Sequence, residues 1–231
     1  MKKTLMTILV SGLMLASCSK QEVSDNPLLQ KWDTPFETAP FEKIKVEHYL
    51  PAFEAAIAEH NKEIQAIIDN AEAPTFDNTI AALDYSGETL SKVAGVFFNM
   101  MAANTSEELQ KVNEKVGPMM ATHSDNVSMN AKLFEKIKAV YDAKDSQKYT
   151  GEQLALLEKT YNKFVRSGAL LDAAKQEELR KVNAELTKVE SKFDANLLKE
   201  SKAYQLVIDK EENLKGLPQG EIEKAAALAK S

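Results

Sequence analysis

Residues 47–70 read EHYLPAFEAAIAEHNKEIQAIIDN, and this stretch indicates how the chain folds. Its apolar side chains return at intervals of three and four residues, which is the period of an α-helix with one buried face. Pro51 falls in the first turn, where a helix does not need the backbone N–H that proline lacks. The stretch is therefore predicted to be a long amphipathic helix. Its apolar stripe consists of Phe53, Ile57, His60, Ile64, Ile67 and Ile68.

The same helical period recurs over most of the remaining chain. Glycine and proline are sparse, with eight and seven among 231 residues, so little interrupts the pattern. Thr75 or Asp77 can cap one further helix, and Thr105 or Ser106 can cap another. Further helices are expected over residues 75–103, after residue 106, and over residues 130–143 and 151–167.

Three residues inside these helices predict local features. Gly87 and Gly95 are small, and small residues in a helix usually allow a neighbouring helix to come close, at some cost in helix propensity. Pro118 is expected to kink the helix that begins after Ser106.

Residues 172–201 are predicted to form the longest helix. Apolar side chains step by three and four along it, which approximates a heptad repeat. The repeat is short and neighbouring helices are available, so we expect the stripe to pack within its own domain and not in a coiled coil between chains. The stripe consists of Leu179, Val182, Leu186, Val189 and Phe193.

The pattern changes after this helix. Residues 204–208 alternate in polarity and favour β-structure, so one short strand is expected there. No partner strand is evident upstream, and a lone strand is not stable, so we expect the fold to continue in further residues. Residues 216–218 predict a turn, and residues 219–230 predict another helix. The predicted fold class is all-α, a multi-helix lobe with this one strand as its only β element.

The first residues are expected to be a targeting signal and not part of the fold. Lys2 and Lys3 precede an apolar run over residues 5–15, which is shorter than the roughly 20 apolar residues that span a bilayer. This arrangement is typical of a secretory signal peptide. The run ends in LASC at residues 15–18, which resembles a bacterial lipobox with Cys18 as the lipidated residue. Cys18 is the only cysteine in the chain, and a plain signal peptide with an incidental cysteine is the alternative.

Lipid on Cys18 would attach the chain to a membrane, since roughly two or more acyl chains give stable anchoring. Ser19 follows the cysteine, whereas an Asp there would resemble a signal for inner-membrane retention. The expected location is therefore the bacterial cell envelope, at the outer membrane. The expected organisation is a signal peptide (1–17), the lipidated cysteine with a tether and an extended lead-in (18–45), a helical N-terminal lobe (46–203) and the start of a further region (204–231).

The composition argues against several classes of function. The net charge is −6 and no basic tract is present, so nucleic acid is not an expected partner. With Cys18 lipidated, no thiol remains for a disulfide, and stability must come from an apolar core. No phosphate-binding loop, nucleotide fingerprint or calcium-binding loop occurs. The pairs Met100–Met101 and Met119–Met120 are interpreted as core filling, in preference to a soft-metal or peptide-binding face.

The chain has three histidines, and none lies in an HExxH motif. A catalytic zinc needs about three protein ligands in one site. His60 lies on the apolar stripe and is expected at the edge of the core, while His48, near a helix start, is expected to face solvent or the lead-in. His123 lies in the sequence THSD, but consecutive helical residues point in different directions. No catalytic, metal-binding or cofactor-binding residue is therefore assigned, and Cys18 is the one candidate site residue.

Several segments form a recognisable pattern through their order and spacing, and the most specific of them is YNKFVRSGALL at residues 161–171. The others are NPLL (26–29), FEKIKVEHYLPAF (41–53), PTFDNTI (74–80), FDANLL (193–198) and LKGLP (214–218). Together they resemble the family of bacterial dipeptidyl carboxypeptidase and oligopeptidase A, which are relatives of thimet oligopeptidase. The resemblance covers essentially all of the chain after the expected signal peptide.

The resemblance implies a zinc metallopeptidase much longer than this chain. In that family, two mainly helical lobes face each other across a deep channel that admits short, unfolded peptides. The zinc ligands and the catalytic glutamate lie in the C-terminal part, and no position here matches them, so no catalytic residue is carried over. The chain would correspond to the N-terminal lobe, which forms one wall of the channel, and it is predicted to be inactive alone. Its contribution would be shape, access and peptide positioning.

Two functions of different classes follow. In the first, the chain is the N-terminal piece of a lipid-anchored zinc peptidase, and residues beyond Ser231 supply the HExxH site. In the second, it is a stand-alone helical lipoprotein that binds peptides or protein partners without catalysis. We prefer the first, because of the resemblance and because the helix expected over residues 219–230 has no end signal before Ser231.

Overall fold

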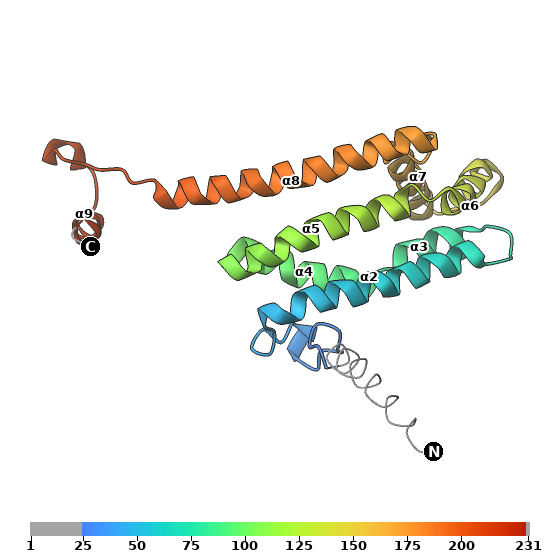
Figure 1. Cartoon of the computed structure of the whole chain (residues 1–231), viewed down its shortest axis with the longest axis horizontal. Helices are drawn as coiled ribbons and strands as arrows, with labels where there is room; N and C mark the ends of the chain where they lie inside the picture. Colours follow the sequence, from blue (N-terminus) through green and yellow to red (C-terminus); the bar gives the residue numbers. More distant parts are fainter. Residues whose placement is uncertain (1–24, 230–231) are drawn as a thin grey trace, which may run out of the picture. The chain divides into compact units, whose positions relative to one another are not determined.

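The computed structural model describes residues 25–229, apart from the side chain of Glu211, and all regular secondary structure in that range is helical. The predicted all-α class is confirmed (Figure 1). The chain divides into two compact units, and the boundary between Val189 and Glu190 lies inside the longest helix. The α-helices are α2 (Val46–Asp69), α3 (Ala82–Tyr85), α4 (Glu88–Ala103), α5 (Glu107–Ser128), α6 (Ala131–Asp142), α7 (Gly151–Arg166), α8 (Ala173–Ala203) and α9 (Gln219–Leu228). The shorter turns are the 3-10 helices η1 (Pro35–Glu37), η3 (Lys144–Ser146) and η4 (Glu211–Leu214) and the π-helical turn η2 (Phe76–Ala81).

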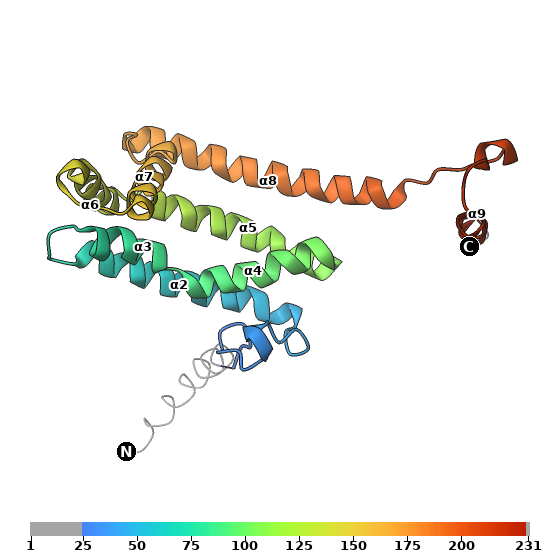
Figure 2. The same cartoon turned by 180° about the vertical axis from the view of Figure 1, so that it is seen from behind.

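The first core lies between α2, α4 and α5, which run side by side in both views of the chain (Figure 1, Figure 2). Phe53 of α2 and Phe97 of α4 are fully buried and meet edge to face, with ring centroids 5.4 Å apart. Leu28, from the segment before α2, is also fully buried. Its neighbour Asn26 donates a side-chain N–H to the carbonyl oxygen of His48 at 2.8 Å. Burial of a large apolar side chain such as Phe53 or Leu28 stabilises the fold by about 1.5–3 kcal/mol.

The second core joins the other end of α2 to η2, α6 and α7. Ile64 and Ile67 of α2 are buried there against Leu133 and Ile137 of α6 and Leu157 of α7. Helix α2 thus contributes to both cores, and most of its apolar stripe is covered. The helix predicted over residues 47–70 is confirmed, with each end shifted by one residue.

Two of the predicted helix starts are confirmed by their caps. Ser106 accepts the backbone N–H of Leu109 at 3.2 Å at the start of α5, and Thr75 accepts that of Asn78 at 3.1 Å at the start of η2. Helix α5 continues through Pro118 without interruption, and the kink expected there stays a prediction. The helices expected over residues 130–143 and 151–167 are confirmed as α6 and α7.

The single helix predicted over residues 75–103 is wrong. The segment consists of η2, α3 and α4, and it breaks between Tyr85 and Glu88. Gly87 has a φ of +74°, a left-handed conformation that glycine adopts without a Cβ clash. A Cβ at this position would lie 3.1 Å from the imidazole of His60, so the turn closes over that ring. Around Gly95 the described residues place no atom of another element within 4 Å, so the close neighbour expected there is not found.

The long helix is confirmed as α8, but the expected packing of its stripe is wrong. None of the residues of α8 is buried, and Val182, Leu186 and Val189 are 61%, 51% and 55% exposed. The strand expected over residues 204–208 is also wrong, because these residues have no regular structure and their side chains are exposed. A strand needs a partner for its backbone groups, and the described residues supply none.

Among the described residues, every helix is too short or too polar to cross a bilayer. The signal peptide and Cys18 lie outside the described residues, so the lipid anchor and the part boundaries proposed for that region stay predictions.

Candidate functional site

Two histidines that are 63 positions apart in the sequence meet between α2 and α5. The Nε2 atom of His123 lies 2.9 Å from Nδ1 of His60, and the ring centroids are 4.9 Å apart. His123 is buried, and His60 is half-buried at the edge of the core, as expected for a histidine on the apolar stripe. On its other side, Nε2 of His60 lies 3.1 Å from the hydroxyl oxygen of Ser86.

The hydrogen bonds of this cluster run in one direction. Ser86 donates its hydroxyl proton to the carbonyl oxygen of Leu83 at 2.7 Å, so its oxygen accepts the Nε2–H of His60. A neutral imidazole has one donor nitrogen and one acceptor nitrogen. The Nδ1 atom of His60 therefore accepts a hydrogen bond from Nε2–H of His123. His60 is neutral in this arrangement, because one of its ring nitrogens donates and the other accepts.

Charged groups around the histidine pair come from α2 and α7. Glu63, on α2, accepts the backbone N–H of Gly87 at 2.7 Å and so holds the start of α4 against α2. Burial lowers the pKa of His60, the Glu63 carboxylate opposes this lowering, and the ammonium group of Lys163 adds to it. Burial and the neighbouring His60 also lower the pKa of His123. Both shifts favour the uncharged form of the two imidazoles.

Ser86 and His60 are the serine and the histidine of a hydrolytic triad by residue type, but their hydrogen bonds are those of a structural cluster. A serine nucleophile must donate its proton to the imidazole, whereas the proton of Ser86 goes to Leu83. The N–H of Gly87, which would be a candidate to stabilise an oxyanion beside Ser86, is held by Glu63. We assign this cluster the role of joining α2, α5 and the turn before α4.

The remaining predicted residues have simple roles. The Nδ1 atom of His48 accepts the backbone N–H of Lys45 at 3.0 Å, so His48 faces the lead-in, as predicted, and caps the start of α2. The four methionines at positions 100, 101, 119 and 120 pack against the first core, which confirms their interpretation as core filling. Within residues 25–229, no group of three or more His, Cys, Asp and Glu side chains is placed to hold a metal ion. Cys18 lies outside that range.

Polar side chains attach the first half of α8 to α5. Asn183 donates to the carboxylate of Asp125 at 2.8 Å, and Arg180 donates to the side-chain oxygen of Asn126 at 2.9 Å. Asp125 is only 9% exposed, so this contact is well shielded from solvent. The start of α8 is therefore held by hydrogen bonds more than by burial of its apolar stripe.

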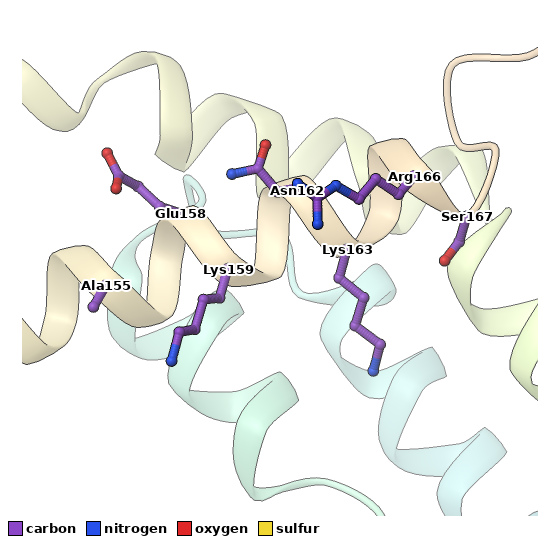
Figure 3. Close-up of a pocket in the computed structure, with 7 residues that line it drawn as sticks. All are labelled: Ala155, Glu158, Lys159, Asn162, Lys163, Arg166 and Ser167. Atoms are coloured by element: carbon purple, nitrogen blue, oxygen red, sulfur yellow. The ribbon is translucent and has the colours of Figure 1, made fainter.

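A groove of about 560 Å³ lies along α7 (Figure 3). Lys159, Lys163 and Arg166 line it at helical spacings of four and three, which place them on one face of the helix. Among the ion pairs of the described residues, none involves these three cations. The one acidic residue of the groove, Glu158, lies 3.3 Å from the ammonium group of Lys144. The remaining lining residues are Ala155, Asn162 and Ser167.

Sequence reasoning missed both the histidine pair and this groove. The spacing of Lys159, Lys163 and Arg166 was visible in the predicted helix and could have indicated a basic face. No comparable signal existed for the histidines, because the register between α2 and α5 depends on packing between distant segments. His60 was recognised only as a residue of the apolar stripe.

The comparisons with known proteins identify the family of this domain. Residues 53–176, more than half of the chain, match the family model described as Neurolysin/Thimet oligopeptidase, N-terminal domain. The chain is 36% identical over 208 residues to a dipeptidyl carboxypeptidase of Salmonella typhimurium, covering 90% of this chain and 31% of that protein. It is 35% identical over 205 residues to the dipeptidyl carboxypeptidase of Escherichia coli, covering 89% of this chain and 30% of that protein.

A more distant relative extends the same relationship. Oligopeptidase A of Escherichia coli is 24% identical over 209 residues, with 89% of this chain and 30% of that protein covered. The chain thus spans less than a third of the length of these relatives. It belongs to the neurolysin and thimet oligopeptidase family, of which it carries the N-terminal domain.

Proposed function

We propose that this chain is the non-catalytic N-terminal lobe of a peptidase that hydrolyses short peptides, and that it forms one wall of the substrate channel. One observation carries the proposal: the chain aligns along 90% of its length with a dipeptidyl carboxypeptidase but covers only 31% of it. The lobe would contribute by limiting access and by holding a peptide in register with catalytic groups that lie elsewhere. Holding reactants in a productive geometry lowers the entropic part of the reaction barrier.

Zinc is the cofactor proposed for the complete enzyme, and the described residues do not fit it. A catalytic zinc site takes about three protein ligands. Within residues 25–229 no such group of His, Cys, Asp and Glu side chains is present, and the nitrogens of His60 and His123 that face each other are already hydrogen-bonded. No step of the hydrolysis is therefore assigned to these residues.

The exposed apolar stripe of α8 supports a role as part of a larger protein. Val182, Leu186 and Val189 lie on one side of the helix, and each is more than half exposed. Contiguous exposed apolar surface commonly marks a contact site. We propose that this stripe packs against the remainder of the peptidase.

The intact mass of the native product tests the proposal. An antibody to residues 46–203 would isolate the protein from envelopes of the source bacterium. A mass well above that of this 231-residue chain, together with peptidase activity that a chelator removes, is the expected result. A mass equal to that of the signal-cleaved, lipidated chain would reject the channel-wall role and support the stand-alone, peptide-binding lipoprotein.

We further propose that lipid on Cys18 attaches the protein to the outer membrane, in the four-part organisation set out above. The support is the LASC sequence at residues 15–18 and the absence of any other cysteine. Labelling with radioactive palmitate should mark the wild-type chain and not a Cys18→Ser variant. Equal labelling of both proteins would contradict the assignment.

A further inference from the structure

The groove on α7 is positively charged, and its side chains include hydrogen-bond donors that can bind a peptide. Lys159, Lys163 and Arg166 place three positive charges along one helical face of a chain whose net charge is −6. In Figure 3, Lys159 and Lys163 extend from the same side of α7, and the side chain of Arg166 runs back along the helix toward Asn162. The side chain of Glu158 points away from the two lysines. The carboxylate of Glu158 is engaged by Lys144 at 3.3 Å, so it does not neutralise the groove.

The helix dipole accounts for only part of this arrangement. Lys163 and Arg166 lie in the last turn of α7, where cations stabilise a helix. Lys159 precedes that turn, beyond the reach of this effect. The dipole also does not explain why the three cations line a hollow surface together with Asn162 and Ser167.

We propose that this groove binds the carboxylate group of a short peptide. The planar guanidinium of Arg166 can hold a carboxylate through two parallel hydrogen bonds, while Lys159 and Lys163 add positive charge to the same groove. The amide of Asn162 and the hydroxyl of Ser167 can bond to peptide backbone groups next to that carboxylate. The inference rests on the proposed function, and it adds the chemical group that the channel wall recognises.

The same carboxylate chemistry can come from the C-terminus of a peptide or from an Asp or Glu side chain. Three fluorescent peptides of otherwise equal sequence distinguish these sources. One carries Gln and an amidated C-terminus, one carries Gln and a free C-terminus, and one carries Glu and an amidated C-terminus. Binding of each to the full chain in detergent is measured by fluorescence anisotropy.

The test variant is Lys159→Gln, Lys163→Gln and Arg166→Gln together. The matched control is Lys111→Gln, Lys115→Gln and Lys132→Gln, which removes the same charge from exposed lysines on α5 and α6. We expect at least one carboxylate peptide to bind more tightly than the neutral one. The groove variant should abolish this preference and the control should retain it. Each single substitution should weaken binding about two- to fivefold, and added salt should weaken it further.

Helix content of the variants is checked by circular dichroism. Lys159→Gln lies outside the last turn of α7, so it leaves the helix dipole contribution intact and provides a second test if the triple variant is unstable. Equal binding of neutral and carboxylate peptides would overturn the inference while leaving the proposed function standing. Equal weakening of peptide binding by the control substitutions would also overturn it. A fluorescent oligonucleotide measured in the same way would overturn it as well if it bound more tightly than any peptide. Failure of all peptides to bind would count against the proposed function itself.

Discussion

Helices α2 and α8 carry the same kind of apolar stripe, but the two stripes meet different surroundings. In α2, Phe53 is fully buried and Ile64 is 5% exposed, whereas in α8 Val182 is 61% exposed and Leu186 is 51% exposed. Helix α2 lies between two cores, with α4 and α5 at one end and α6 at the other. Helix α8 is joined to α5 by hydrogen bonds from Arg180 and Asn183. A helical period therefore predicts an apolar face but not what covers that face.

The largest difference in stability is expected between two variants that each lack one phenylalanine, one on α2 and one on α8. Phe53→Ala leaves a cavity in the first core and should lower the free energy of unfolding by about 3–5 kcal/mol. Phe193→Ala, on α8, removes a side chain that is 64% exposed and should change it by less than about 0.5 kcal/mol. Urea unfolding followed by circular dichroism measures both. Equal losses in the two variants would show that the α8 stripe is packed as tightly as that of α2.

A smaller loss is expected from Gly87→Ala, which disturbs the turn that closes over α2. The new Cβ would meet the ring of His60 at 3.1 Å, and the φ of +74° strains any residue other than glycine. We expect a loss of about 1–3 kcal/mol in the free energy of unfolding. Gly95→Ala is the matched control, because no atom of another element lies near that position, and alanine there should stabilise α4 slightly. Thermal unfolding of the two variants should therefore shift in opposite directions.

The histidine pair on α2 and α5 makes the stability of the lobe depend on pH. Burial lowers the pKa of both imidazoles in the folded state below the ordinary value of about 6.5. Below that pH the imidazoles of the unfolded chain take up protons that the folded chain excludes. The pair therefore contributes its full stabilisation above about pH 6.5, and this contribution is lost as the pH falls through the lower pKa values of the folded state. Urea unfolding at about pH 8 and about pH 5.5 should show lower stability at the acidic value.

The His60→Gln/His123→Gln double variant provides the control for this measurement. Glutamine can still form hydrogen bonds but does not titrate in this range, so the acid loss should be smaller than in the wild type. An acid loss of the same size would assign the pH dependence to the carboxylates of the chain.

The smallest effect on stability is expected from Leu186→Lys on α8. The side chain is 51% exposed, so a lysine should change the free energy of unfolding by less than about 0.5 kcal/mol. The variant should nevertheless bind less ANS than the wild type, because it interrupts the exposed apolar stripe. A large loss of stability would mean that the stripe is covered in solution. Ile64→Lys is the matched substitution on α2, where the side chain is 5% exposed, and it should destabilise the lobe much more than Leu186→Lys does.

The predictions that succeeded depended on neighbours along the chain. The bounds of α2, α6, α7 and α8 follow from helical periods. Thr105 and Ser106 are both cap candidates, because a hydroxyl before a helix can accept a backbone N–H, and the structure shows Ser106 as the cap of α5. The failures depended on distant segments. Gly87 was expected inside a helix, and its role as a break became visible only with the ring of His60 beside it. The strand at residues 204–208 failed because its formation requires a partner.

The helical class, the main helix bounds and the family can be read from the sequence, since each of these depends on local periodicity or on motifs along the chain. The contact of His60 with His123, the hydrogen bond from Gly87 to Glu63, and the coverage of the α2 stripe but not of most of the α8 stripe depend on the three-dimensional packing. The physical reason is that the register and the coverage of a helix face depend on the shapes of segments far away in the chain, and no local pattern encodes them.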